Sequence, residues 1–462
     1  MLPYTNTEIL PAVIDRRCAT IQKHCLPKNN SMSDDSQEFA TEPVPAGHQV
    51  GWIRVGLISA MVGFSLPTFV AGVEVFQATP NDRAAVAVLM GCAMLTFIGA
   101  LTGSIGARTH LSSYMLARIA FGVKGAALVN LAFAVSLLGW FGVNIDLFSV
   151  ALLRLMNDVL GMSGVPWLVE LFAGVVMTVT TIYGFQAINR LSMLLVPVMM
   201  VVTVLLINTA LGIEPLGEIL SGADAGELSF GDATSSVVGG VIVGAVILPD
   251  ITRFIARWQG AIFTVLLSYL IVNSVVMISG GIAADVLAND DFLDVMILMG
   301  LGWGAFAIII AGSWVLNTLN LYSTTLSVEA TIPRLENRLS IVILGVIGTG
   351  AAFLNILDFF LTFLFYLAIV FVPVAGVIAV DYLFARRSAF HEELESAQRD
   401  FSPLALAAWA GGAAVALLGS AGLLRISGIA ALDAMLISAF AYAVLSRFDT
   451  KGVAERGETE SG

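Results

Sequence analysis

The chain has 462 residues, of which 58% are hydrophobic and 12% are charged, and its net charge at pH 7 is −12. Soluble domains are about 25% charged, so this composition excludes an ordinary water-soluble fold and predicts an all-α membrane protein. The acidic balance and the lack of a basic stripe exclude nucleic acid as a partner. With 3 cysteines and 4 histidines, we expect no disulfide framework, no metal and no cofactor.

The first 50 residues are polar and lack the apolar core of a signal peptide, which predicts a disordered cytoplasmic tail. Met32 opens an acidic stretch, "MSDDSQEF", that is typical of a natural N-terminus. We therefore interpret residues 1–31 as an upstream extension of the chain.

Twelve apolar stretches follow this tail, each near the length of about 20 residues that a membrane helix requires. The first ten, within residues 51–385, predict a core; the last two lie within 386–447, and 448–462 is a C-terminal cytoplasmic tail. The expected spans lie near 52–76, 84–107, 126–155, 165–185, 190–212, 233–256, 260–287, 298–328, 339–354, 358–384, 402–423 and 428–446.

The basic residues give the orientation of these spans. All lysines and arginines lie on one side of the twelve-span arrangement except Arg83, Arg154 and Arg425. The segment "GIEPLGEILSGADAGELSFGDA" on the opposite side contains acids and no base. Because basic loops remain in the cytoplasm, this bias predicts a plasma (inner) membrane protein with both termini in the cytoplasm.

Two spans, five apart in the order, are interrupted by glycine and proline. Proline removes a backbone donor and glycine loosens a helix. Breaks in corresponding helices of two halves are typical of transporters with inverted repeats, although membrane helices also use glycine and proline for packing alone. The interrupting residues are Gly63, Pro67 and Gly72 in the first span, and Gly239, Gly240, Gly244 and Pro249 in the sixth.

Several motifs resemble those of the nucleobase:cation symporter-1 family, the purine–cytosine permeases. They are "IGART", "LARIAFGVKG" and "GWFGV" within 99–143, "PDITRF" at 249–254, "NLYSTTLS" at 320–327, "VIGTGAAF" at 346–353 and "FVPVAGVIAVDYLFARR" at 371–387. The resemblance covers roughly residues 45–450. It implies a LeuT-like fold with twelve helices, a five-plus-five inverted repeat, broken helices 1 and 6, and a substrate site between spans 1, 3, 6 and 8.

The resemblance also implies which residues contact the substrate. Trp140 matches a tryptophan that stacks on the nucleobase ring, and Asn144 lies one turn further on the same face. Asn317 matches an amide of the eighth span; Asn320, one turn along, is either a second ligand or a contact between helices. The remaining positions of the expected substrate site are Leu137, Gly240 and Val241.

Three departures from the cytosine permeases involve four positions. Leu137 stands where they have a glutamine, and Val241 where they have an aromatic residue. These changes leave open a cytosine- or purine-type nucleobase, or allantoin, hydantoin or a thiamine-precursor pyrimidine. Val315 and Leu316 replace paired hydroxyls that help to bind sodium. Because a sodium ion needs several oxygen ligands, we favour a proton as the coupling ion; sodium-coupled cytosine symport is the alternative.

Carboxylates at membrane depth are candidates for carrying that proton. Glu74 follows Pro67 in the first span, and its alternative role is that of a wetted residue of an outer vestibule. Asp146 follows Trp140 in the third span, and its alternative is an orientation away from the site.

Two further acids are assigned structural roles. Asp250 and Arg253 share a helix face and predict a gate or structural ion pair, whereas Asp381 is interpreted as structural. We therefore expect a monomeric, proton-coupled importer of a nucleobase-like molecule. A membrane enzyme or sensor would need a catalytic constellation or a soluble domain, and the sequence shows neither.

Overall fold

The computed structural model describes Phe39 and residues 42–221, 228–332, 336–354, 360–385, 400–424 and 426–459. Within these ranges the regular secondary structure is helical, apart from one isolated bridge between Val50 and Ile255. The interpretation of Met32 as the start of the chain lies outside the described residues.

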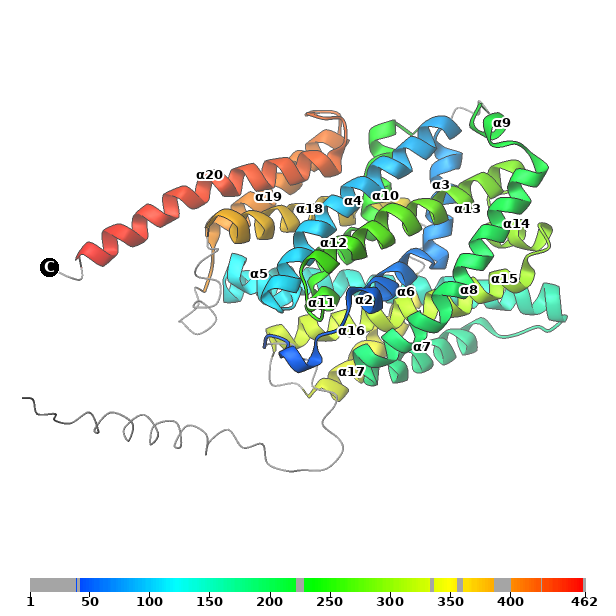
Figure 1. Ribbon diagram of the computed structural model, residues 1–462, viewed down its shortest axis with the longest axis horizontal. Helices are drawn as coiled ribbons and strands as arrows, with labels where there is room; N and C mark the ends of the chain where they lie inside the picture. Colours follow the sequence, from blue (N-terminus) through cyan, green and yellow to red (C-terminus); the bar gives the residue numbers. More distant parts are fainter. Residues whose placement is uncertain are drawn as a thin grey trace, which may run out of the picture. The chain divides into compact units, whose positions relative to one another are not determined.

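The first half of the chain contains helices at the expected positions of spans 1 to 6 (Figure 1). They are preceded by the short 3₁₀ helix η1 (Ala46–His48). The helices are α2 (Trp52–Gly63), α3 (Leu66–Ala78), α4 (Asn81–Thr109), α5 (Ser113–Phe121), α6 (Val123–Leu160), α7 (Pro166–Ile182), α8 (Gly184–Ile213), α9 (Leu216–Ser221), α10 (Phe230–Val246) and α11 (Pro249–Thr252).

The second half contains helices at the expected positions of spans 7 to 12, with three π-helical segments. They are α12 (Gln259–Val265), the π segment η2 (Leu266–Asn273), α13 (Ser274–Val286), α14 (Phe292–Leu298), α15 (Gly302–Ala307), the π segment η3 (Ile308–Ser313), α16 (Trp314–Thr331), α17 (Asn337–Ala351), η4 (Ala352–Leu354), α18 (Phe360–Val380), the π segment η6 (Asp381–Ala385), α19 (Pro403–Ser420) and α20 (Ala430–Thr459).

Length and hydropathy show how many of these helices can cross a membrane. Among the described residues, 8 helices are long and apolar enough, or up to 9 when the bent pair α2 and α3 is counted as one span. Helices α7 and α17 are apolar but shorter. The structure thus confirms the all-helical membrane fold, while the full count of twelve spans stays a prediction.

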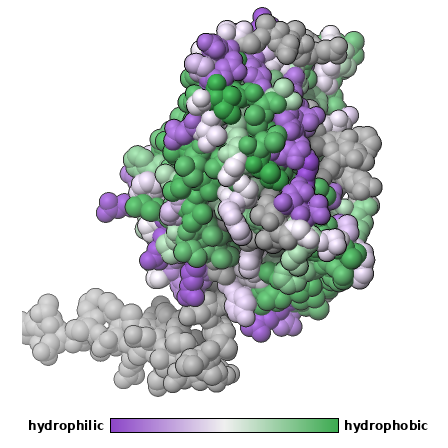
Figure 2. Space-filling model, turned by 90° about the vertical axis from the view of Figure 1, so that its right-hand side faces the viewer, coloured by the Kyte–Doolittle hydropathy of each residue, from purple (hydrophilic) through white to green (hydrophobic). Residues whose placement is uncertain are grey.

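Large hydrophobic side chains are exposed on the outer faces of several helices. Leu131 and Val135 on α6, Phe172 on α7 and Leu194 on α8 are each at least 60% exposed. Figure 2 shows hydrophobic side chains over much of the viewed face. Apolar surface on this scale indicates contact with lipid rather than with water.

The first span is broken, as the sequence predicted. Helix α2 ends at Gly63, α3 has Pro67 in its first turn, and the two axes differ by 50°. The break frees the carbonyl of Val62, and the Ser65 hydroxyl donates to that oxygen at 2.7 Å. The hydroxyl of Thr68 lies 3.2 Å from that of Ser65. Hydroxyls therefore satisfy the backbone at the point where the helix pattern stops.

The sixth span is broken only near its end. Helix α10 continues past Gly239 and Gly244 to Val246, and α11 begins at Pro249. The prediction that Gly239, Gly240 and Gly244 break the helix is therefore wrong, and so is the prediction that Gly72 interrupts the first span, because Gly72 lies within α3. Gly239 is required by packing instead, because a Cβ there would overlap the carbonyl oxygen of Leu364 on α18.

The helices form two groups. Helices α3, α4, α10 and α13 pack on one another, and so do α6, α7, α16 and α17. Helices α19 and α20 lie side by side and contact α18 (Figure 1). The first group contains elements of spans 1, 2, 6 and 7, and the second contains elements of spans 3, 4, 8 and 9. Each group draws on both halves of the repeat, and so does a site that lies between the groups.

Residues just before the first span are ordered, although the sequence assigned them to a disordered tail. The N–H of Val50 donates to the Phe254 carbonyl at 2.6 Å, and the N–H of Val44 donates to the His110 carbonyl at 3.0 Å. Val44 is only 3% exposed. The predicted disorder does not extend to residues 42–50, because their backbone is paired with the segments after α4 and α11.

Candidate functional site

A cavity of about 80 Å³ lies among both pieces of span 1, α6, both pieces of span 6 and α16. Most of its walls are aliphatic. One carboxylate, Asp250, and one indole, Trp140, face it. Its other polar side chains are Ser59, Ser65, Thr68, Tyr269, Asn320 and Ser323. The cavity therefore occupies the place where the sequence predicted the substrate site.

Trp140 forms the aromatic part of the α6 wall. Its side chain is 7% exposed, and its ring packs edge-on against Phe363 of α18, with centroids 5.5 Å apart. Leu137, one turn earlier on α6, lines the same cavity. An indole held in this way offers a fixed apolar surface against which a planar ring can stack.

The α10 wall has little side-chain bulk. Gly240, Val241 and Gly244 line the cavity there. A Cβ on Gly244 would lie 3.7 Å from the hydroxyl of Tyr269, which faces the cavity from the π segment η2. Val241 thus provides an aliphatic contact in this wall.

The two amides of α16 have different places. Asn320 lines the cavity, and its Nδ2 donates to Asn317 Oδ1 at 3.4 Å. Asn317 is fully buried behind it and donates its own Nδ2 to the Phe141 carbonyl at 3.0 Å. Asn317 therefore connects α16 to α6 and positions Asn320, which is the amide that a bound molecule can reach.

Asn144 lies outside the cavity lining. Its Nδ2 donates to the carbonyl of Trp140 at 2.7 Å, and its Oδ1 has no hydrogen-bond partner among the described residues. The side chain is fully buried. In this structure Asn144 stabilises the turn of α6 that carries Trp140, and it does not contact the cavity directly.

The two coupling candidates also lie outside the cavity lining. Glu74 on α3 is partly exposed and has Asp290 as a charged neighbour. Asp146 on α6 is partly exposed and close enough to Glu170 of α7 for their like charges to repel. The structure therefore separates both carboxylates from the cavity that contains Trp140.

Asp250 and Arg253 do not form the direct ion pair that we expected. Arg253 Nε donates to the main-chain carbonyl of Asp250 at 3.1 Å, and its terminal nitrogens donate to the Phe39 carbonyl and the Tyr322 hydroxyl. The Asp250 carboxylate instead accepts from the N–H and the hydroxyl of Ser113, at 2.9 and 2.6 Å. The Arg253 guanidinium points away from the Asp250 carboxylate because it donates to the main-chain carbonyl of Asp250 at the end of α11, which is a single helical turn.

Several cavity residues were missed from the sequence. Ser65 and Thr68 flank the predicted break at Pro67, and that position could have identified them. Tyr269 faces the cavity from a π-helical segment, a feature frequent at functional sites but without a sequence signal here. No group of three or more potential metal ligands occurs in the part of the chain that the structure describes.

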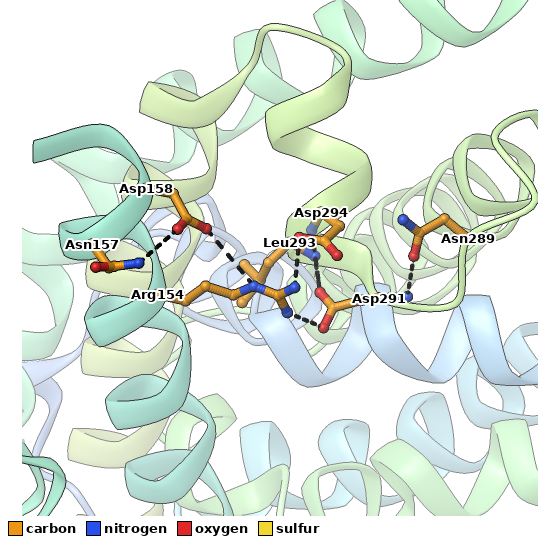
Figure 3. A network of polar contacts seen from close by, with 7 residues as sticks. All are labelled: Arg154, Asn157, Asp158, Asn289, Asp291, Leu293 and Asp294. Atoms are coloured by element: carbon orange, nitrogen blue, oxygen red, sulfur yellow. Dashed lines mark hydrogen bonds and ion pairs between the residues drawn. The ribbon is translucent and has the colours of Figure 1, made fainter. Parts of the chain in front are cut away.

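A second polar network lies near the C-terminal end of α6 (Figure 3), and none of its residues lines the cavity. The Arg154 guanidinium pairs with Asp291 through Nη1 and with Asp294 through Nη2, the latter at 2.7 Å. Asp291 also caps α14 by accepting from the N–H of Leu293 at 2.9 Å. The network therefore connects the end of span 3 to the segment between spans 7 and 8.

Comparison with known proteins agrees with this architecture. The model of the family "Permease for cytosine/purines, uracil, thiamine, allantoin" matches residues 58–445. The cytosine permease of Escherichia coli K12 is 30% identical over 364 residues, which cover 78% of this chain and 84% of that protein. The hydantoin permease of Microbacterium maritypicum is 24% identical over 372 residues, 74% of each chain.

Solved structures show the same fold. A nucleobase-cation-symport-1 transporter, in a closed conformation with bromovinylhydantoin bound, has a TM-score of 0.79 at 20% identity and covers 90% of this chain and 96% of its own. A structure of the inward-facing conformation of Mhp1 has a TM-score of 0.75 at 18% identity and covers 92% of this chain and 96% of its own. This chain therefore belongs to the family of permeases for cytosine/purines, uracil, thiamine and allantoin, and it is a multi-pass membrane transporter rather than an enzyme.

Proposed function

We propose that this permease imports a planar nitrogen heterocycle of the nucleobase type by alternating access. The observation that carries the proposal is the joint presence of the Trp140 indole and the Asn320 amide in one cavity at the break of span 1. The indole suits stacking on a flat ring, and an amide supplies both a donor and an acceptor to a ring edge. Trp140 and Asn320 are thus the proposed substrate-binding residues, with Gly240, Val241 and Leu137 shaping the walls.

The side chains of the cavity walls and the known relatives suggest an order in which substrates should be tested. Leu137 and Val241 supply apolar contacts but neither an amide nor a second ring. A cytosine- or purine-type base is the first candidate, since cytosine permeases are the more similar relatives. A hydantoin is the second, because a hydantoin permease matches most of the chain. Allantoin and a thiamine-precursor pyrimidine complete the set to be tested.

We propose further that protons rather than sodium ions drive uptake. Val315 is fully buried and Leu316 lines the cavity. Because both side chains are aliphatic, neither position offers a side-chain oxygen. Hard cations need several oxygen ligands to replace their water, and Val315 and Leu316 offer only their main-chain carbonyls. A proton requires only one acidic group and a path for water, which suits a cavity with few polar atoms.

The charge pattern supports a setting in the cytoplasmic membrane, with both termini in the cytoplasm. We propose separately that the transporter acts as a monomer. Arg154 is one of the few basic residues on the proposed outer side. It is surrounded by Asp158, Asp291 and Asp294 (Figure 3), so it adds no net positive charge there. The orientation given by the other basic residues is therefore consistent with the packing.

A counterflow assay tests the substrate class without depending on the coupling ion. Proteoliposomes loaded with unlabelled compound would be diluted into trace radiolabelled cytosine, uracil, adenine, hypoxanthine, allantoin or hydantoin. We expect counterflow with at least one of these six, competed by its ring analogues. A purified, folded protein that exchanges none of them would contradict the proposed function.

A further inference from the structure

Among the described residues, Asp250 is the only carboxylate that lines the cavity, and the residue is 1% exposed. Its two oxygens have different environments. Oδ1 accepts both hydrogen bonds from Ser113, while buried Oδ2 has no hydrogen-bond partner in the described structure. Buried carboxylate oxygens are normally paired, so an unpaired one at the edge of a cavity points to a ligand.

The groups around Asp250 come from several helices. From α5, the buried hydroxyl of Tyr114 lies close enough to the carboxylate to interact with it as a hydrogen-bonding group, and so does the hydroxyl of Ser323 from α16, although neither meets full hydrogen-bond geometry at Oδ2. Directly after α11, Arg253 attracts the carboxylate charge without forming an ion pair with it, and its nitrogens donate to the main-chain carbonyls of Asp250 and Phe39 and to the Tyr322 hydroxyl.

The remaining neighbours of α11 add no direct counter-charge. On α4, Arg108 stacks on the ring of Trp258 at 4.1 Å, and after α4, His110 is bonded through Nδ1 to the Arg253 carbonyl at 2.8 Å. On α2, Arg54 is exposed to the surroundings. Among the described residues, the carboxylate thus has one cation within electrostatic range, Arg253, and no residue in an ion pair with it.

We propose that the transported proton binds to Oδ2 of Asp250, a proposal that rests on the proton-coupled function given above. Asp250 takes up a proton from the water on the outer side, and because an unpaired charged carboxylate is costly in a closed cavity at membrane depth, closure favours the protonated form. Water that enters when the other side opens hydrates the carboxylate and, together with the attraction of Arg253, favours the charged form again. The bound proton neutralises the carboxylate and leaves as a hydrated proton when the other side opens. Glu74, by contrast, has no contact with the cavity.

Asp250→Asn is the direct test, because the amide oxygen can still accept the Ser113 hydrogen bonds. Glu74→Gln is its matched control, since it removes the carboxylate that the sequence favoured. Counterflow and pH-driven accumulation would be measured in proteoliposomes with radiolabelled cytosine, or with the panel compound that the wild type exchanges. One proton per substrate and one pH unit support at most about tenfold accumulation. We expect Asp250→Asn to lose this accumulation and keep counterflow, and Glu74→Gln to keep both.

Two results would overturn the inference: full accumulation by Asp250→Asn, or loss of accumulation in Glu74→Gln alone. A substrate-free measurement separates this inference from the proposed function. Infrared difference spectra of the purified protein over a pH series should contain a protonated-carboxyl band in the wild type and in Glu74→Gln that is missing in Asp250→Asn, beside the bands of the other carboxyl groups. If Asp250→Asn does not fold, Asp250→Glu should shift the pH at which this band appears. An unchanged band in either Asp250 variant contradicts the assignment, whatever the substrate is.

Discussion

Replacing Trp140 by alanine removes the aromatic wall of the cavity. The indole is 7% exposed and lines the cavity, so the substitution removes its stacking surface. Loss of a base–aromatic stack costs about 1–3 kcal/mol, which is about a 5- to 150-fold loss of affinity. The ring also packs on Phe363, and truncating a buried tryptophan costs about 3–5 kcal/mol of folding stability. Affinity must therefore be measured on protein shown to be folded.

The assay is equilibrium binding of the radiolabelled compound to purified protein, with thermal unfolding recorded for the same sample. Trp303→Ala is the matched control, because this indole is 72% exposed and outside the cavity lining. It should retain wild-type affinity, and Trp140→Phe should recover part of the loss. An unchanged affinity in folded Trp140→Ala would remove Trp140 from the binding site and refute the stacking argument.

Three further predictions concern single residues. Asn320→Leu should change the ranking of ring analogues in competition assays, whereas Asn144→Leu should lower thermal stability and keep that ranking. A changed ranking in Asn144→Leu with an unchanged one in Asn320→Leu would place Asn144 in the site. Gly72→Ala should reduce the yield of folded protein, because its Cβ would overlap the Met277 carbonyl. Gly411→Ala is the control, since a Cβ there meets no atom within 4 Å, and equal yields of the two variants would contradict the packing argument. Arg154→Gln should lower the melting temperature at low salt and less at high salt, and a salt-independent effect would exclude an electrostatic cause.

The fold could be predicted from the sequence because the bilayer restricts the chain to helices of known length. The break in span 1 was predictable because Pro67 cannot continue the hydrogen-bond pattern of the helix before it. The position of Trp140 followed from a motif, and the structure places it at the cavity between the two helix groups. These features depend on local sequence, and the structure agrees with each of them.

Other features depend on contacts between helices and could not be predicted. Gly239 is explained by the Leu364 carbonyl on another helix rather than by a break. Asn317 and Asn320 lie three residues apart, and only the rotation of α16 decides which of them faces the cavity. Arg253 was expected to pair with the Asp250 carboxylate, but its partners come from segments far away in the sequence.

Gradient-driven uptake into proteoliposomes tests the central claim most directly. The compound that shows counterflow would be supplied outside, with an inward proton gradient in sodium-free buffer or with an inward sodium gradient at equal pH. The absence of hydroxyls at Val315 and Leu316 predicts accumulation with the proton gradient and no stimulation by sodium. A severalfold stimulation by sodium alone, without a response to the proton gradient, would contradict proton coupling and indicate a sodium site built from main-chain carbonyls.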